Sequence, residues 1–329
     1  MKILITGAAG YIGNKLAHTL ATRGEEVHAL VRSDSANELL QHPKIKIFKG
    51  DILQKESLMA AIKGCKQVYH TAARVGVWAR DSSVFYDVNV KGTGNVLNAA
   101  LQAGVERTVY TSSCGVIGPS LNEPMKEDDP RTTDFDIDYD RSKKMGEDLV
   151  IQYAKEGMNT VIVCPSKVYG PGNTSHSLTA NAIINNFLIK KITFIPLPGT
   201  YKVCFAFIDD IVNGHLLAME KGPMGGRYIL GGCNISYYEF FDRIRMLSCC
   251  KGRIIQLPKS VIKALALMQK LNHNLTGSPI RFTPRSTNYL FSNYTFSSEK
   301  AIRDLGYRIT SLEEALHKTI HFLNNKMHE

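Results

Sequence analysis

The chain has 329 residues, of which 44% are hydrophobic and 21% are charged. This balance is typical of a folded globular protein, and it excludes a disordered chain, a collagen-like repeat and a small disulfide-rich scaffold. No apolar run reaches the roughly 18–20 residues of a membrane span. The first six residues lead straight into a glycine turn, so we expect no signal peptide.

The net charge of +10 is uneven, because residues from 250 onward carry 12 Lys and Arg against 5 Asp and Glu. These basic residues are scattered, which indicates a solvated face and no nucleic-acid partner. The seven cysteines form neither a C-x-x-C pair nor a cluster with histidines at zinc spacing. We therefore expect reduced thiols, no metal site and a cytoplasmic location.

Short apolar strands alternate with helical patterns through the first half of the chain, which is typical of a parallel sheet flanked by helices. The predicted strands span residues 2–6, 27–32, 45–48, 67–70, 108–111 and 160–164. The predicted helices span residues 11–23, 83–103 and 139–154. The predicted fold class is α/β, with a doubly wound parallel sheet.

A glycine-rich turn joins the first strand to the first helix and reads Thr6-Gly7-Ala8-Ala9-Gly10-Tyr11-Ile12-Gly13. Glycines allow a tight turn and let backbone N–H groups approach a pyrophosphate, which the N-terminus of a helix favours. Its position makes the motif specific. The residues predicted to bind a dinucleotide here are Gly7, Gly10, Tyr11, Ile12 and Gly13.

The alternation becomes irregular after Gly170-Pro171-Gly172. We expect a dinucleotide-binding Rossmann domain over 1–170, with its sheet completed by part of 200–235, and mainly a smaller α/β substrate-binding cap over 171–329. An apolar helix predicted at 260–272 carries Lys263 and Lys270. Its pattern is compatible with a membrane surface, but we expect a helix buried in the cap.

The end of the second strand favours one nicotinamide cofactor over the other. NAD binders place an acid there to hold the ribose 2′-hydroxyl, whereas Arg32 suits the 2′-phosphate of NADP. NADP(H) is therefore favoured, and Asp34 two residues later keeps NAD(H) as an alternative. Asp51 and Ile52 follow the third strand and are expected near the adenine, with a turn cap as the other role of Asp51.

Tyr139 and Lys143 are spaced four residues apart, which puts them one turn apart on the same helix face. A free phenol has a pKa near 10, and a fixed ammonium nearby favours its deprotonated form. The hydroxyls of Ser112 and Ser113 stand at the carboxyl end of the fifth strand, where open α/β sheets bind their ligands. The set predicts an acid–base pair at the edge of the sheet where ligands bind.

Together, these signals resemble the extended branch of the short-chain dehydrogenase/reductases, the NAD-dependent epimerase/dehydratase family, over nearly the whole chain. Further matching stretches are residues 71–73, 89–93, 165–172, 207–211 and 226–232. The resemblance implies that the cofactor also meets Thr71, Ala72, Ala73, Asn89, Tyr139, Lys143, Pro165 and Val168.

The resemblance also implies a role for each reacting group. Tyr139 is the general acid or base, and Lys143 holds the nicotinamide ribose and lowers the pKa of the tyrosine. Ser113 hydrogen-bonds the substrate oxygen, with Ser112 as the neighbouring alternative. Asn89 orients the local backbone.

Dehydratases of this branch need two carboxylates beside the serine, and Cys114-Gly115-Val116 supplies none. Epimerases carry an arginine where Val203 stands, which argues against a nucleotide-sugar, although Lys202 precedes it. The stretch 74–81 holds the only tryptophan and looks most like the dihydroflavonol reductase group, which grades into the 3β-hydroxysteroid dehydrogenase-like proteins. The residues expected at the substrate are Trp78, Ser112, Cys114 and Tyr169.

The function that the sequence predicts is an NADP(H)-dependent oxidoreductase acting on a ketone or secondary alcohol of a mostly apolar small molecule. A sugar-type epimerase with tightly bound NAD and a nucleotide-sensing protein without catalysis are the alternatives. Tyr169 and the loop 173–177 are expected to form a lid. A homodimer through the helices 83–103 and 139–154 is also expected.

Overall fold

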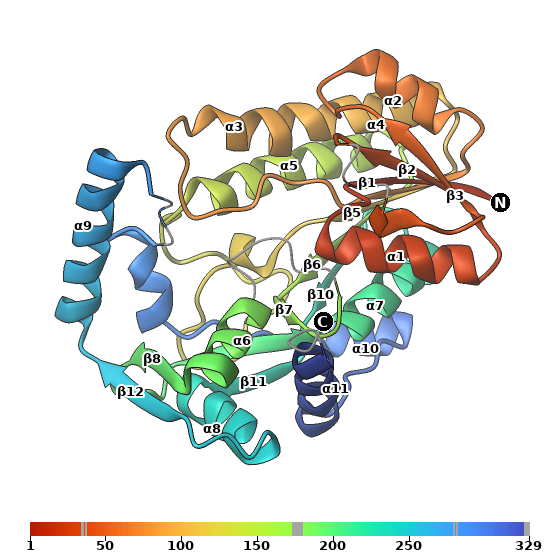
Figure 1. The fold of residues 1–329 in the computed structure, drawn as a ribbon. Coiled ribbons are helices and arrows are strands. Elements are labelled where there is room, and N and C mark those ends of the chain that lie inside the picture. Colours follow the sequence, from red (N-terminus) through yellow and green to blue (C-terminus); the bar gives the residue numbers. More distant parts are fainter. Residues whose placement is uncertain (34–35, 37, 173–179, 279, 281, 326–329) are drawn as a thin grey trace.

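The computed structural model describes residues 1–33, 36, 38–172, 180–278, 280 and 282–325, and within them a seven-stranded parallel sheet runs in the order β10-β6-β5-β4-β1-β2-β3 (Figure 1). Its strands are β1 (Lys2–Thr6), β2 (Glu26–Val31), β3 (Ile45–Lys49), β4 (Gln67–His70), β5 (Arg107–Thr111), β6 (Thr160–Pro165) and β10 (Arg227–Leu230). Strand order reverses around β1, which pairs with both β2 and β4. A ligand crevice is therefore expected at the carboxyl ends of β1 and β4.

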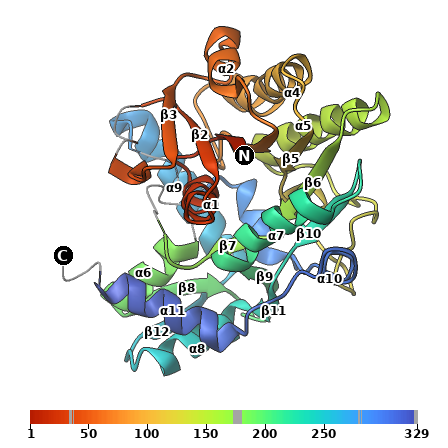
Figure 2. The same cartoon turned by 90° about the vertical axis from the view of Figure 1, so that its right-hand side faces the viewer.

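Helices cover both faces of this sheet (Figure 2). On one face lie α2 (Lys55–Ile62), α4 (Gly92–Gln102) and α5 (Asp138–Lys155), and on the other lie α1 (Tyr11–Thr22) and α7 (Ile208–Lys221). Along β1, Leu4 joins one buried cluster while Ile3 and Ile5 join the other, as the two-residue repeat of a strand requires. Burial on both faces is the reason why the strands are nearly continuous apolar runs.

The connections of the large sheet differ from the predictions in two places. The helix predicted over 83–103 is divided into α3 (Ser83–Tyr86), a π-helical turn η3 (Asp87–Lys91) and α4. The helix α2 was not predicted. Short 3₁₀ turns form at η2 (Glu38–Leu40) and η4 (Cys114–Val116).

The cap contains two small sheets, one in the order β11-β9-β7 and one pairing β12 with β8, within the described residues. Their strands are β7 (Lys167–Tyr169), β8 (Ile192–Pro196), β9 (Lys202–Phe207), β11 (Cys233–Ser236) and β12 (Arg253–Leu257). The other elements of this half are α6 (Ala180–Lys190), α8 (Tyr237–Leu247), α9 (Lys259–Thr276), η5 (Ser286–Phe291), α10 (Glu299–Leu305) and α11 (Leu312–Asn325). The second half of the chain also contributes to the large sheet, because β10 is one of its strands and α7 packs on one of its faces.

The helix α9 contradicts the prediction of a helix buried in the cap. Only two of its residues are buried in the structure, Ile262 and Ala266. The large apolar side chains around the rest of the helix are exposed, up to 85% for Leu275. Across the described ranges, no helix is both long enough and apolar enough to cross a membrane.

Candidate active site

The glycine turn forms a cradle, made by Gly7, Gly10 and Gly13, at the carboxyl end of β1. Gly7 has a φ of +71°, and a Cβ placed on it would lie 2.7 Å from the backbone of Ala72. A Cβ on Gly13 would lie 2.3 Å from the carbonyl oxygen of Gly7. No side chain fits at either position without moving the backbone, so the glycines are required by this turn.

The cradle lies at the start of α1. Gly10 is the N-cap of this 12-residue helix, and in the described part of the chain no side chain caps its first N–H groups. Uncapped N–H groups at a helix N-terminus favour an anion. The residues present therefore fit the pyrophosphate of a dinucleotide. The side chain of Tyr11 turns away to the cap, where its hydroxyl donates to the carbonyl oxygen of Gly170 at 2.6 Å.

A second set of contacts holds the ends of β1 and β4 side by side. The hydroxyl of Thr71 donates to the carbonyl oxygen of Thr6 at 2.7 Å, and the Thr6 side chain is hydrogen-bonded to Nδ1 of His70 at 2.7 Å. Burial lowers the pKa of His70 to about 3, so this imidazole is neutral. These contacts place residues 71–73 against the glycine cradle.

The residues predicted to contact the adenosine half of the cofactor differ in how well the structure places them for that role. Arg32 lies exposed directly after β2, while Asp34 falls outside the described residues. Asp51 has the turn-capping role, since its Oδ1 accepts from the N–H of Leu53 at 2.9 Å. The side chain of Ile52 is buried in the core beneath Gly92. Ile52 therefore has only its backbone to offer a cofactor.

Tyr139, Ser113 and Lys143 meet where β5 ends and α5 begins. The side chains of Tyr139 and Ser113 lie close enough that Ser113 lowers the pKa of the phenol. The ammonium of Lys143 donates to the carbonyl oxygen of Thr111 at 2.7 Å and lies 4.0 Å from the centre of the Tyr110 ring. Only 1% of Lys143 is exposed. The structure thus brings the three predicted reacting groups together.

The pKa of Tyr139 differs from the expectation, which was that Lys143 lowers it. Burial, followed by the negative charge of Asp140, raises the pKa of Tyr139, and the Ser113 side chain opposes that rise. Burial lowers the pKa of Lys143 to about 7. Tyr139 therefore holds its proton at neutral pH, as a proton donor must.

Asp140 was not predicted as part of the site. Burial raises the pKa of its carboxyl group to about 7, opposed by the positive charge of Arg131. Its Oδ2 has no hydrogen-bond partner among the described residues. The carboxylate packs on Gly115, where a Cβ would lie 2.1 Å from Oδ1. One feature of the sequence is compatible with this contact: Gly115 follows closely after Ser113, and a glycine leaves room for a side chain from another segment such as that of Asp140.

Asn89 fixes the backbone next to the site from the π-helical turn η3. Its Oδ1 accepts from the N–H of Arg74 at 2.8 Å, and its Nδ2 donates to the carbonyl oxygen of Arg74 at 3.1 Å and to Ser142 Oγ at 2.9 Å. Asn89 thereby links the segment after β4 to α5. π-helical turns of this kind occur frequently at functional sites.

Pro165 and Val168, predicted on the nicotinamide side, lie at the end of β6 and in β7. β6 is paired with β5, so Pro165 lies beside the segment after β5 that carries Ser113. Lys167 stands between the two predicted residues with its ammonium 6.0 Å from the Phe205 ring, and burial lowers its pKa. Lys167 was not predicted as part of the site.

Three residues predicted at the substrate have other roles in the structure. Ser112 donates to Glu147 Oε2 at 2.5 Å, in a buried network that Arg227 completes through an ion pair of 2.8 Å with Glu147. Cys114 is buried, with its thiol donating to the carbonyl oxygen of Cys164 at 3.1 Å.

Tyr169 is the third of these residues. Its ring is buried and packs against three aromatic rings of the cap, those of Phe205, Phe207 and Phe240. It is a core residue and does not serve as a lid. The loop 173–177, expected to form the lid with it, lies outside the described residues.

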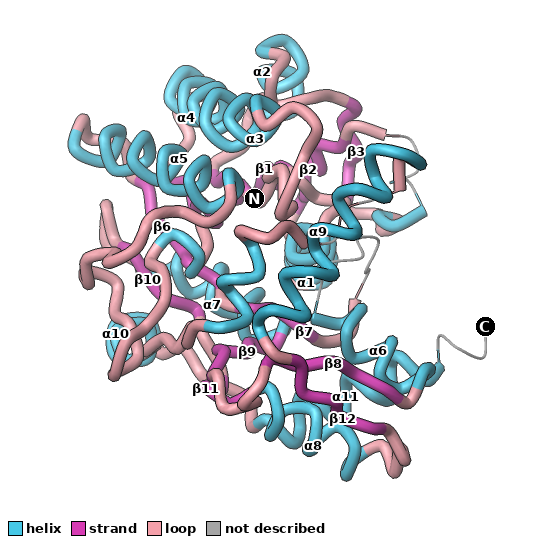
Figure 3. The backbone as a smooth tube through the Cα atoms, turned by 90° about the vertical axis from the view of Figure 1, so that its left-hand side faces the viewer, coloured by secondary structure: helices cyan, strands magenta, loops and turns pink. Residues whose placement is uncertain are grey.

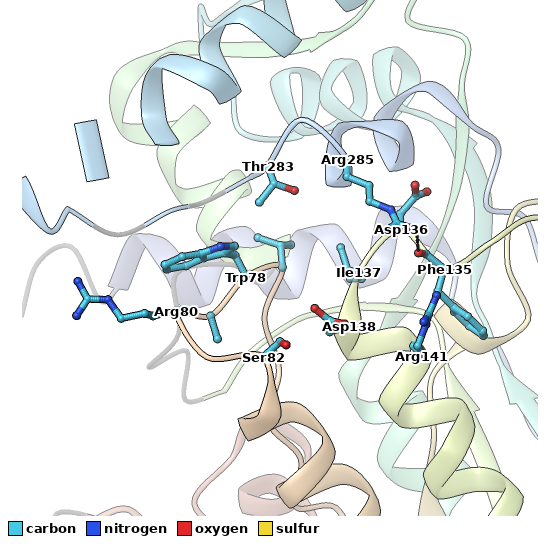
Figure 4. Close-up of a pocket in the computed structure, with 12 residues that line it drawn as sticks. Trp78, Arg80, Ser82, Phe135, Asp136, Ile137, Asp138, Arg141, Thr283 and Arg285 are labelled. Carbon is cyan, nitrogen blue, oxygen red and sulfur yellow. Dashed lines mark hydrogen bonds between the residues drawn. The ribbon is translucent and has the colours of Figure 1, made fainter. Parts of the chain in front are cut away.

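Trp78 lines a cavity of about 360 Å³ beside the start of α5 (Figure 4). Asp138 and Arg141 reach it from α5, and Thr283 and Arg285 reach it from the segment before η5. Tyr139 is next to Asp138 in the chain but is not itself one of the lining residues. The cavity therefore begins one residue before Tyr139 along α5.

The chain is similar to known proteins over nearly its whole length. Residues 3–231 match the family described as NAD dependent epimerase/dehydratase. Sterol demethylase protein B of Methylococcus capsulatus is 31% identical, over 96% of this chain and 96% of its own. The putative dihydroflavonol 4-reductase of Synechocystis is 30% identical, over 98% of this chain and 94% of its own. The 3-beta-hydroxysteroid dehydrogenase of Mycolicibacterium neoaurum is 30% identical, over 96% of this chain and 89% of its own.

Solved structures share the fold across the full length. The crystal structure of gox2253 superposes with a TM-score of 0.81 at 28% identity, over 98% of both chains. UDP-glucose 4-epimerase of Thermotoga maritima also gives a TM-score of 0.81, at 21% identity over 99% of this chain and 100% of its own, which shows a common fold. With the matched family and the relatives, these findings identify the chain as a member of the NAD-dependent epimerase/dehydratase family and an oxidoreductase of the extended short-chain dehydrogenase/reductase type.

Proposed function

We propose that this enzyme is an NADP(H)-dependent reductase or dehydrogenase that transfers a hydride between the nicotinamide and a ketone or secondary alcohol of a mostly apolar small molecule. The observation that carries the proposal is the placement of Tyr139 and Lys143 at the start of α5 against the end of β5, where the Lys143 ammonium reaches Thr111 and Tyr139 interacts with Ser113. These residues lie at the carboxyl edge of the sheet, where the glycine cradle fits a dinucleotide. The exposed Arg32 at the end of β2 supports NADP(H) over NAD(H).

The nicotinamide supplies or accepts the hydride when it is bound. The phenol of Tyr139 donates its proton to the substrate oxygen as negative charge develops there, and Ser113 hydrogen-bonds the same oxygen. An ammonium has three donors, of which Lys143 gives one to the carbonyl oxygen of Thr111. The other donors of the Lys143 ammonium would then be available to hold the ribose hydroxyls of the cofactor.

Two observations support an apolar substrate over a nucleotide-sugar. Trp78, with Phe135 and Ile137, gives one aromatic and apolar wall to a cavity that is otherwise lined mostly by polar and charged residues, and this wall suits a ring system. Val203, at the position where an epimerase carries its arginine, is buried in β9 and offers no charge to a diphosphate. The relatives at 29–31% identity are named for sterols, hydroxysteroids, dihydroflavonols and a farnesylated quinoline ketone, which agrees with that substrate class.

The test compares Tyr139→Phe with the wild type, using NADPH oxidation against steroid ketones and dihydroflavonols. We expect kcat to fall by at least about 100-fold, because the substrate oxygen loses its proton donor. Tyr153→Phe is the matched control. It removes a hydroxyl from the same helix, one that is bonded to Asn98, and should leave kcat unchanged. Near wild-type turnover by Tyr139→Phe would contradict the mechanism.

A separate measurement tests the alternative that the enzyme is an epimerase. The purified enzyme is denatured and the released nucleotide is identified by mass spectrometry. We expect an empty protein or exchangeable NADP. Stoichiometric, retained NAD would favour an epimerase, because such an enzyme regenerates its cofactor within each cycle.

A further inference from the structure

The helix α9 lies on the outside of the molecule (Figures 1 and 3), and most of its large apolar side chains are exposed. It meets the protein through Ile262 and Ala266, while its opposite side carries six exposed large apolar residues: Val261, Leu265, Leu267, Met268, Leu271 and Leu275. At about 100° per residue, these six cover roughly 160° of the helix circumference. A helix of a globular protein normally shows polar side chains on that side.

The charges next to this face are of one sign. Lys259, Lys263 and Lys270 are exposed and follow one margin of the apolar face. The sequence has no Asp or Glu between Asp242 and Glu299, but nine Lys and Arg. An apolar face with a lysine margin is the pattern of a helix that lies in a lipid interface, where lysines reach the phosphates and apolar side chains enter the acyl boundary.

We propose that α9 binds an anionic membrane surface, lying parallel to it with its apolar face in the lipid. A second copy of the chain fits the helix less well. It would bring the same lysines together in a two-fold contact, and α9 has no carboxylate to balance them. Anionic headgroups supply the missing negative charge.

The side of α9 that packs on the protein contacts the Trp78 cavity. The Trp78 ring that lines the cavity packs edge to face on His273 of α9, with 4.7 Å between the ring centres. Gln269 of α9 accepts a hydrogen bond from the N–H of Phe282, next to the lining residue Thr283. Membrane binding through the opposite, apolar face therefore brings the Trp78 cavity to one helix diameter, roughly 10 Å, from the lipid. That consequence rests on the proposed function, whereas membrane binding itself does not.

The experiment measures binding of the full-length protein to vesicles by co-sedimentation. One vesicle preparation contains equal amounts of phosphatidylcholine and phosphatidylserine, and the other contains phosphatidylcholine alone. We expect stronger binding to the first, weakened by salt. The variant Met268→Glu should weaken it about tenfold or more, because one apolar side chain no longer enters the lipid.

The chain offers a closely matched control. Met246 of α8 is 64% exposed and Met268 is 63% exposed, so Met246→Glu makes the same change on another helix and should leave vesicle binding unchanged. The double variant Lys263→Glu and Lys270→Glu should remove the preference for phosphatidylserine. All of these positions are exposed, so circular dichroism and melting temperature should match the wild type.

Trp78 is the only tryptophan and reports on the cavity directly. Brominated lipid should quench its emission when the protein binds, and binding without quenching would overturn the placement of the cavity at the lipid. Unchanged binding by Met268→Glu, an equal loss in Met246→Glu, or a dimer that α9 substitutions dissociate without any vesicle binding would each overturn the membrane contact. None of these outcomes depends on turnover, so they are separate from the Tyr139→Phe result.

Discussion

The buried carboxylate of Asp140 provides a quantitative test of the site. Burial raises its pKa from 3.8 to about 7, so the folded protein binds this proton more tightly than the unfolded chain. Stability from this group is therefore lost as the pH rises from about 4 to about 7, and the full cost applies above 7. At about 1.4 kcal/mol for each pH unit, that cost is about 4 kcal/mol.

The substitution Asp140→Asn keeps the shape and removes the charge. The pKa of about 7 already includes the attraction of Arg131, so the substitution forfeits in addition only a helix-dipole contribution of about 0.3–1 kcal/mol, since Asp140 lies in the first turn of α5. Arg131 keeps its hydrogen bonds to carbonyl oxygens, among them that of Gly115 at 2.6 Å. We expect a net gain in the free energy of unfolding of about 3 kcal/mol at pH 8, falling to about 1 kcal/mol at pH 5.

Urea unfolding followed by circular dichroism at both pH values measures this gain. Asp148→Asn is the control on the same helix, because that carboxylate is exposed and pairs with Lys144; its effect should stay below about 0.5 kcal/mol. Asp140→Asn should also lower the pH above which carbonyl reduction declines, since Asp140 raises the pKa of Tyr139. A destabilised variant at pH 8, or a gain independent of pH, would refute the reasoning.

Two further predictions concern the cofactor, and both are measured by calorimetric titration with NADPH and NADH. Gly13→Ala places a methyl group 2.3 Å from the Gly7 carbonyl oxygen and should weaken the binding of both nucleotides at least about tenfold. The control Gly94→Ala, whose nearest contact is 3.9 Å away, should leave both affinities unchanged. Equal affinities for the wild type and both variants would rule out the cradle as the binding site. Arg32→Glu should weaken NADPH about tenfold or more by losing a charge-assisted contact while NADH binding is retained or strengthened, and an equal loss of both nucleotides would count against a 2′-phosphate contact.

Local pattern was sufficient to predict the large sheet and its glycine cradle. Apart from the edge strand β3, the strands of the sheet are buried on both faces, so their apolar runs are visible without knowledge of their partners. The glycines follow from the close approach of the backbone, which excludes any side chain at Gly7 and Gly13. Tyr139 and Lys143 were predictable as a pair because a four-residue spacing fixes their relation on one helix.

The choice between neighbouring hydroxyls required the tertiary structure. Ser112 and Ser113 are chemically equal, but successive side chains of an extended segment point in opposite directions. Ser112 consequently meets Glu147, while Ser113 meets Tyr139. The partner Glu147 comes from α5 and cannot be inferred from the strand alone. The same reasoning applies to Tyr169, whose aromatic neighbours come from β9 and α8.

The sequence by itself determined the parallel sheet, the dinucleotide cradle and the reacting pair, because these depend on residues close together in the chain. Only the tertiary structure decided that Asp140 is buried, that Trp78 borders a cavity and that α9 is exposed. α9 is apolar around most of its circumference, so its pattern does not say which side packs on the protein. That side is set by which surfaces meet when distant segments pack, and the remaining apolar face is left for a partner.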